Sequence, residues 1–376
     1  ALQAAPEDRV EFALHHLQSG RYLQYGSVFS STSDGTLTAE SFNVVVDQTV
    51  VDSSQSYGYT AQTRSVCQRF TFEKKDVEGD VYYHILPLLR VDEEVKCVYR
   101  SEYRLVSENG TAKVKEMTVT EATVEDPTSG RWRLQQTAGG KYLIKNVATG
   151  TYLNVENDTV CLTQQQPRST LWELKAISLA MEKDYQQYTN TCGAASGKMI
   201  VNYLTGQKLD DDAFLERFVA MKGSYNYSLE SVTDVVNSYL NSDNQLYKFY
   251  DSLLTQNNLQ ETIAKSLNKA YPVAINSKPL ETYNDQVTGF GYSYRVESNN
   301  GHYFVVKGLY YNSDTKKYDS VINETHYKFG AHPLGKYGST SPVYRQYNNI
   351  GGRDTVVCFD ILHQVYTQRH YGLMYM

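Results

Sequence analysis

The stretch that decides the fold of the C-terminal half reads Gln186-Gln187-Tyr188-Thr189-Asn190-Thr191-Cys192-Gly193-Ala194-Ala195-Ser196-Gly197-Lys198-Met199-Ile200. Its apolar end predicts a helix that begins close to Cys192, where the positive end of the helix dipole stabilises a thiolate over a thiol. The small residues after Cys192 are expected to leave room for a substrate backbone. An amide N–H of Gln186, six residues earlier, is placed to stabilise the oxyanion of an acyl-transfer intermediate together with the Cys192 backbone N–H. Gln187 is the less favoured alternative for this role.

A cysteine nucleophile needs a base, and the downstream sequence offers one. His302 follows Gly301 and opens the apolar run Tyr303-Phe304-Val305-Val306, which reads as a strand. A second predicted strand, 318–323, ends in Asn323. If the two strands are neighbours, His302 and Asn323 come together as base and orienting residue for Cys192. Asp319 and Glu324 compete with Asn323 for the third role, whereas His326 and His332 are read as surface or cleft residues.

With these motifs in place, residues 184 to about 370 resemble the papain-like cysteine peptidases of the bacteriocin-processing, C39-like type. The matching elements are the Gln-x5-Cys-Gly-x-Ala segment, the Gly-His-Tyr-x-Val-Val segment and the strand that ends at Asn323. The resemblance implies an α+β papain-like domain in which Cys192, His302, Asn323 and Gln186 are the catalytic residues. The family often has Asp-Pro where this chain has Asn323-Glu324, which is the main departure.

The N-terminal part contains a threefold repeat of four short segments separated by Gly, Asn and Asp turns. The segments are 11–17, 19–25, 34–38 and 68–72 in the first copy, 81–86, 102–106, 109–114 and 131–134 in the second, and 140–146, 149–155, 157–163 and 171–174 in the third. Three copies of four strands predict a β-trefoil, similar to the ricin-type lectin domain. Trp132 and Trp172 are expected in its core. Gln24 and Asn154 stand where a sugar-binding aspartate is expected, so the resemblance favours the fold over a lectin function.

Composition narrows the classes of function. The chain has 376 residues and a net charge of −6, so it lacks the basic footprint of a nucleic-acid-binding protein. No apolar run is long enough to predict a membrane span, and no signal peptide is recognisable at the start. The five cysteines show no zinc-binding spacing, and four of them are expected to be buried thiols, with a disulfide among Cys67, Cys97 and Cys161 as the alternative. Abundant tyrosine and few cysteines suit a secreted or cell-surface bacterial protein.

These observations predict a two-domain chain of the multidomain class: an all-β trefoil over residues 1–177 and an α+β papain-like cysteine peptidase domain over residues 178–376. The expected function is hydrolysis of peptide bonds in a protein or peptide substrate, with no cofactor and with a trefoil that binds a glycan or a protein. Two alternatives stay open: a lectin-like binding protein with an inactive peptidase-like domain, and an acyltransferase or transpeptidase that uses the same nucleophile.

Overall fold

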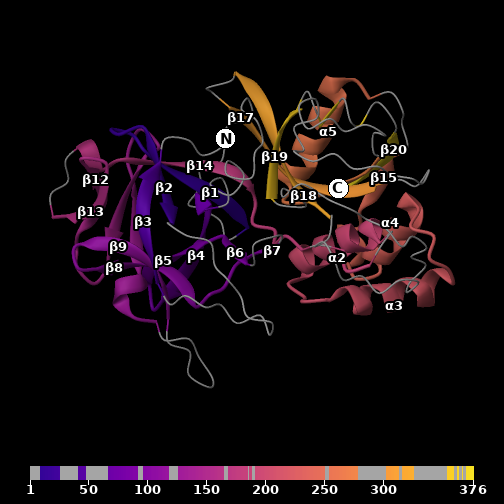
Figure 1. Cartoon of the computed structure of the whole chain (residues 1–376), viewed down its shortest axis with the longest axis horizontal. Coiled ribbons are helices and arrows are strands. Elements are labelled where there is room, and N and C mark those ends of the chain that lie inside the picture. Colours follow the sequence, from indigo (N-terminus) through magenta and orange to yellow (C-terminus); the bar gives the residue numbers. More distant parts are fainter. Residues whose placement is uncertain are drawn as a thin grey trace. The chain divides into compact units, whose positions relative to one another are not determined.

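The computed structural model of the chain describes residues 9–25, 41–47, 67–91, 96–117, 126–164, 168–184, 186–188, 191–249, 254–277, 302–312, 316–325, 354–359, 362–363, 366 and 370–376. The chain divides into two compact units, with the main boundary between Ala180 and Met181. Each unit is described here by itself (Figure 1).

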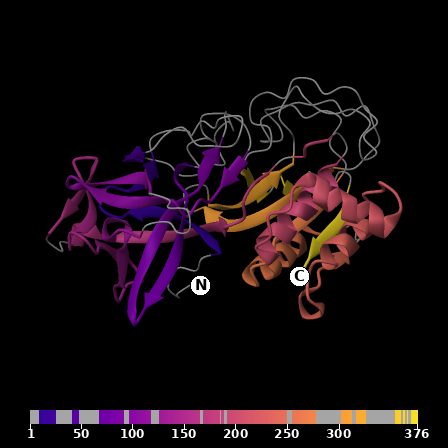
Figure 2. The same ribbon diagram turned by 90° about the horizontal axis from the view of Figure 1, so that it is seen from below.

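Six strands of the N-terminal domain pair into a closed ring. Figures 1 and 2 draw the strands of this domain in indigo to magenta. The six ring strands are β1 (Val10–His16), β4 (Phe70–Val77), β5 (Asp80–Pro87), β10 (Trp132–Gln136), β11 (Tyr142–Asn146) and β14 (Trp172–Leu179). Each pairs antiparallel with the next in this order, and β14 pairs back onto β1. A sheet that closes in this way has no free edge strand.

Three further hairpins complete the repeat. The hairpin strands are β2 (Arg21–Tyr25) with β3 (Ser41–Asp47), β8 (Tyr103–Glu108) with β9 (Thr111–Glu116), and β12 (Tyr152–Glu156) with β13 (Thr159–Thr163). Each repeat therefore gives two strands to the ring and one hairpin beside it, which is the β-trefoil topology. Two short strands, β6 (Leu89–Val91) and β7 (Lys96–Val98), form a separate pair. The expected strand at 34–38 lies outside the described residues, and the structure has β3 in its place in the repeat.

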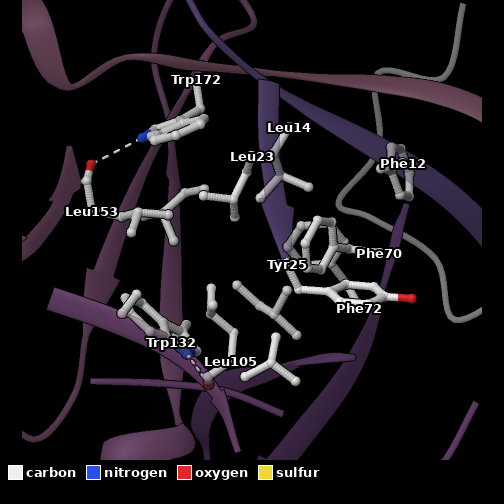
Figure 3. Packing of buried hydrophobic residues seen from close by; sticks show 14 of the residues in the cluster. Phe12, Leu14, Leu23, Tyr25, Phe70, Phe72, Leu105, Trp132, Leu153 and Trp172 are labelled. Atoms are coloured by element: carbon white, nitrogen blue, oxygen red, sulfur yellow. Dashed lines mark hydrogen bonds between the residues drawn. The ribbon is translucent and has the colours of Figure 1, made fainter. Parts of the chain in front are cut away.

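The trefoil core is aromatic and aliphatic, as its sequence pattern predicts. Trp132 and Trp172 are fully buried, and their indole N–H groups donate to the carbonyls of Leu105 at 2.8 Å and Leu153 at 2.9 Å (Figure 3). Each tryptophan thus supplies a large apolar surface and also satisfies a buried carbonyl of its own repeat. The prediction that both are core residues is confirmed.

The C-terminal domain is built on a six-stranded sheet with the order β15–β20–β16–β17–β18–β19. Its strands are β15 (Tyr247–Phe249), β16 (Val273–Ser277), β17 (His302–Asn312), β18 (Lys317–Glu324), β19 (Asp354–Cys358) and β20 (His370–Tyr375). Its helices are α2 (Cys192–Thr205), α3 (Asp211–Lys222), α4 (Leu229–Asn237) and α5 (Gln256–Asn268). The neighbouring strands of this sheet, as far as the structure describes them, pair antiparallel.

Strand alternation gives this sheet two apolar faces, each covered by helices. Tyr303 and Val305 of β17 pack in one cluster with residues of α2, α3 and α4, whereas Phe304 and Val306 pack in another with residues of α5. Close packing between the helices depends on Gly197 of α2, because a Cβ built there would lie 2.7 Å from Cζ of Phe214. The sheet therefore holds α2, the helix that begins at Cys192, against β17.

Candidate active site

Cys192 is the first residue of α2, as the sequence predicts. Thr191 precedes it as the N-cap residue and uses its hydroxyl to donate to the carbonyl of Tyr188 at 2.7 Å. The Cys192 side chain is 8% exposed and belongs to the cluster between the helices and the sheet. Cys192 therefore joins the start of α2 to the cluster that also contains Tyr303 and Val305 of β17.

The small residues after Cys192 do something other than expected. A Cβ on Gly193 would lie 3.1 Å from the ring of Tyr303 and 3.2 Å from Cβ of Tyr227. Ala194 and Ala195 are also buried. The space beside Gly193 is thus filled by two tyrosines of the protein, and the glycine brings α2 close to β17 instead of leaving room for a substrate.

Gln186 lies in the segment before α2 whose described residues are 186–188, the Gln186 loop. Its backbone N–H donates to the carbonyl of Thr325 at 2.9 Å, which ties the loop to the end of β18. Its side-chain amide Nε2 donates to the carbonyl of Tyr188 at 3.0 Å. Because an amide nitrogen carries two hydrogens, this bond fixes the Gln186 side chain and uses only one of its two donors.

His302 and Asn323 lie on neighbouring strands, as predicted. β17 and β18 are antiparallel, with Val305 opposite Asn323 and Phe304 opposite Glu324. His302 is the first residue of β17 and pairs with Ser277 of β16. Residues directly opposite each other share a face of the sheet, and successive residues of a strand alternate between the two faces. The positions of His302 and Glu324 are therefore on one face, and the position of Asn323 is on the other.

The Asn323 side chain is fully buried and already makes one bond. Its Nδ2 donates to the carbonyl of Glu182 at 3.2 Å, in the segment that leads to Gln186. Within the described residues, its Oδ1 has no hydrogen-bond partner. Asn323 therefore supports the segment before the Gln186 loop and keeps an unused acceptor. Asp319, the competitor farther along the strand, is also buried and lies opposite Tyr310.

A buried ion cluster, made of Lys198, Asp184 and Asp211, lies beside the Gln186 loop and was missed by the sequence analysis. The Lys198 ammonium contacts Asp184 at 2.8 Å and also contacts Asp211. Burial alone lowers the pKa of Lys198, but the charges of Asp184 and Asp211 outweigh burial and raise it above its usual value. A lysine within an apolar helical run was the only available signal.

The acidic residues at the start of α3 cap this helix and also bond the segment around Gln187. Asp210 caps the helix by accepting from the backbone N–H of Ala213 at 2.8 Å. Asp211 accepts from the backbone N–H of Gln187 at 2.7 Å, and Asp212 accepts from the hydroxyl of Tyr188 at 2.6 Å. In the described part of the chain, no group of three or more His, Cys, Asp or Glu residues is arranged to hold a metal ion.

The N-terminal domain contains a cavity of about 450 Å³ that includes Asn154, the residue compared above with a sugar-binding aspartate. Asn154 is buried, lies 3.2 Å from Nε2 of His16 and donates to Glu156. Burial lowers the pKa of His16, which keeps its imidazole neutral. The polar atoms of Asn154 are thus used within the protein, which agrees with the weak lectin signal in the sequence.

Cys67, Cys97, Cys161 and Cys192 form no disulfide, so the predicted thiols are found and the alternative disulfide among the first three is not. Cys67 and Cys97 are buried and Cys161 is half-buried. The helices within the described ranges include none that is long and apolar enough to cross a bilayer. His326 and His332 lie outside the described residues.

Comparison with known families addresses the C-terminal domain directly. Residues 179–354 match the Peptidase_C39 like family. The match contains Gln186, Cys192, His302 and Asn323 and confirms the resemblance to C39-like peptidases. The predicted fold class, a β-trefoil followed by an α+β papain-like peptidase domain, is confirmed as well.

Comparison with curated proteins gave no match. Among solved structures, SeviL bound to asialo-GM1 saccharide is 14% identical, with 44% of this chain and 96% of that chain covered and a TM-score of 0.27. The BEL β-trefoil is 13% identical, with 46% and 97% covered and a TM-score of 0.30. The Haemophilus ducreyi cytolethal distending toxin is 15% identical, with 46% and 89% covered and a TM-score of 0.29. Likenesses at this level carry no functional argument, and the trefoil assignment rests on the strand pairing.

Proposed function

We propose that the C-terminal domain is a cysteine peptidase that hydrolyses peptide bonds. The observation that carries this proposal is the position of Cys192 as the first residue of α2, directly after the bonded Gln186 loop, within the segment that matches the C39-like family. A nucleophile at a helix N-terminus, an amide donor in the preceding loop and a histidine at the start of an adjacent strand are the components of thiol-dependent acyl transfer.

The proposed reaction has two stages. His302 takes the proton of the Cys192 thiol, and the thiolate attacks the peptide carbonyl to form a tetrahedral oxyanion. The Cys192 backbone N–H and the second hydrogen of the Gln186 amide stabilise this oxyanion. The C–N bond then breaks as His302 protonates the leaving amine. In the second stage His302 accepts a proton from water, the resulting hydroxide attacks the thioester, and the acid product leaves with regeneration of Cys192.

Two residues of β18 are candidates for orienting His302. Asn323 is the predicted one, and its buried Oδ1 is an acceptor without a partner among the described residues, as an imidazole N–H would require. Glu324 is favoured by the strand register, because it pairs with Phe304 and its position is therefore on the same face of the sheet as that of His302. The two observations make opposite predictions for the activities of Asn323→Ala and Glu324→Gln.

The trefoil is proposed to bind the substrate or a partner, either a glycan or a protein, and thereby to recruit the peptidase domain. The extracellular location and bacterial source that the composition suggests stay predictions. Two alternatives stay open: transfer of the acyl group to an amine instead of water by the same nucleophile, and ligand binding by a lectin-like protein whose peptidase-like domain is inactive.

The proposal is tested by incubating the full chain with a library of peptides and identifying new termini by mass spectrometry. We expect cleavage products that Cys192→Ala abolishes. Adding a primary amine separates hydrolysis from acyl transfer, because a transferase gives amide products in place of free acids. Products formed equally by Cys192→Ala, or an absence of both cleavage and acyl transfer, would contradict the proposal.

A further inference from the structure

Lys198 is a fully buried lysine in the helix that carries the proposed nucleophile. It lies on α2 six residues after Cys192, and its exposed fraction is 0%. Moving an ammonium group out of water is costly, so a buried lysine needs opposite charges beside it. Here Asp184 accepts from Nζ at 2.8 Å, and Asp211 contacts Nζ from the other side.

The two carboxylates belong to segments that flank the Gln186 loop. Asp184 lies two residues before Gln186, and its backbone N–H also donates to Sδ of Met199 on α2 at 3.3 Å. Asp211 lies in the first turn of α3 and accepts from the backbone N–H of Gln187 at 2.7 Å. Lys198 therefore joins α2 to the residues on both sides of the Gln186 amide.

The hydrogen bonds of the Gln186 loop connect the two proposed oxyanion donors, the Gln186 amide and the Cys192 backbone N–H. The Gln186 side chain donates to the carbonyl of Tyr188, which also accepts from the Thr191 hydroxyl. Thr191 in turn is the residue before Cys192. A displacement of Asp184 or Asp211 would therefore reach both the Gln186 amide and the Cys192 backbone N–H through one or two hydrogen bonds.

We propose that Lys198 is a positioning residue for the oxyanion site, acting through Asp184 and Asp211 on the Gln186 loop. The inference rests on the proposed function and deepens it. Apolar residues of similar volume often replace buried ion pairs with no loss of stability, so a contribution to folding alone does not explain a buried lysine. A role in fixing the geometry of the reacting centre explains the buried lysine, because oxyanion donors act only when they are held in place before the reaction.

The test compares two reagents on Cys192 that need different parts of the site. Iodoacetamide alkylates a thiolate by displacement of iodide and forms no oxyanion. p-Nitrophenyl acetate acylates the same sulfur through a tetrahedral oxyanion and releases p-nitrophenolate. The ratio of the acylation rate to the alkylation rate therefore reports oxyanion stabilisation separately from thiolate reactivity. The full chain is used, with Cys192→Ala subtracted as background.

Lys198→Met keeps an unbranched side chain that is one atom shorter and removes its charge. We expect this substitution to lower the acylation-to-alkylation ratio about tenfold or more, since loss of a whole oxyanion donor costs about 100- to 1,000-fold. Gln186→Ala serves as the positive control for the ratio. Lys222→Met is the matched negative control, because Lys222 also bonds an aspartate, Asp234 at 2.5 Å, but joins α3 to α4 away from the loop.

An unchanged ratio in a folded Lys198→Met protein overturns the inference. If that variant does not fold, Asp184→Asn decides the question, because Asp184 is partly exposed and its loss leaves Lys198 paired with Asp211. A lower ratio in Asp184→Asn supports the inference, and an unchanged ratio overturns it. Failure of the proposed function looks different: in that case wild-type Cys192 reacts with neither reagent faster than an ordinary thiol.

Discussion

Replacing Gly193 with alanine tests the contact between α2 and β17, which holds Cys192 near the strand that begins at His302. The new Cβ would lie 3.1 Å from Cδ2 and Cε2 of Tyr303 and 3.2 Å from Cβ of Tyr227. Ordinary carbon contacts are about 3.5–4.0 Å, so the tyrosines or the helix must move by a few tenths of an ångström. Tyr303 has little freedom, because it is buried and its hydroxyl donates to the carbonyl of Tyr227 at 3.0 Å.

Two opposing effects make the change in stability small. Overpacking costs about 1–3 kcal/mol, whereas alanine in place of glycine in a helix contributes about 1 kcal/mol. We therefore expect Gly193→Ala to lose only about 0–2 kcal/mol of unfolding free energy. A misplacement of 1 Å costs about 100-fold in rate, so a shift of about 0.3 Å should lower the acylation rate about fourfold.

Gly197→Ala is the matched control on the same helix. Its Cβ would lie 2.7 Å from Cζ of Phe214 and 3.1 Å from Cγ2 of Val236, both on neighbouring helices. We expect it to be the less stable variant in urea unfolding, yet to retain the wild-type rate of Cys192 acylation by p-nitrophenyl acetate while folded. The reasoning is refuted if Gly193→Ala keeps the wild-type rate, or if the rates of both variants simply follow their stabilities.

Three further predictions concern other parts of the chain. If Asn323 orients His302, Asn323→Ala should lower the rate of peptide cleavage and Glu324→Gln should not; the reverse pattern assigns the role to Glu324, as the register suggests. The hydrogen bond with His84 lowers the pKa of Glu73 most; burial raises it, Lys75 lowers it further, and the pKa falls from 4.5 to about 2. The contribution of Glu73 to the unfolding free energy is thus complete above about pH 4.5 and is lost as the pH falls toward 2. It amounts to about 1–2 kcal/mol after allowance for solvent screening. Urea unfolding of Glu73→Gln should therefore depend less on acid pH than that of the wild type. Because Asn154 is bonded within the protein, calorimetry should detect weak galactoside binding or none, and tight binding lost in Asn154→Ala would show that the lectin function was underestimated.

The parts of the fold that were predictable are those that short sequence patterns determine. Turns of the Asn-Gly and Asn-Asp type and period-2 alternation located most trefoil strands, and the buried tryptophans follow from the same repeat. The start of a helix at Cys192 was also predicted, from the apolar run that follows it. Such features depend on neighbours within a few residues, so the sequence carries them directly.

The parts that were missed depend on contacts between distant segments. β20 lies between β15 and β16 in the sheet, but its short sequence gives no sign of that central place. Gly372 in β20 becomes meaningful only in the structure, where a Cβ would lie 2.3 Å from the carbonyl oxygen of Phe249. Likewise, Lys198 reads as an exposed helix residue until Asp184 and Asp211 converge on it. The sequence spacing predicted that Asn323 lies on a strand beside β17. Only the strand register shows that Asn323 and Glu324 differ in which of them shares a face of the sheet with the position of His302.

The central claim, that Cys192 is an activated nucleophile, is tested most directly by its reactivity relative to the other cysteines. Cys161 is the best control, because it is more exposed than Cys192, while burial and the charge of Glu156 raise the pKa of its thiol. With limiting iodoacetamide at pH 6 and peptide mass spectrometry of all five cysteines, we predict that Cys192 is modified first and that His302→Ala removes this preference. Modification of Cys161 ahead of Cys192, or a preference for Cys192 that survives in His302→Ala, would contradict the account.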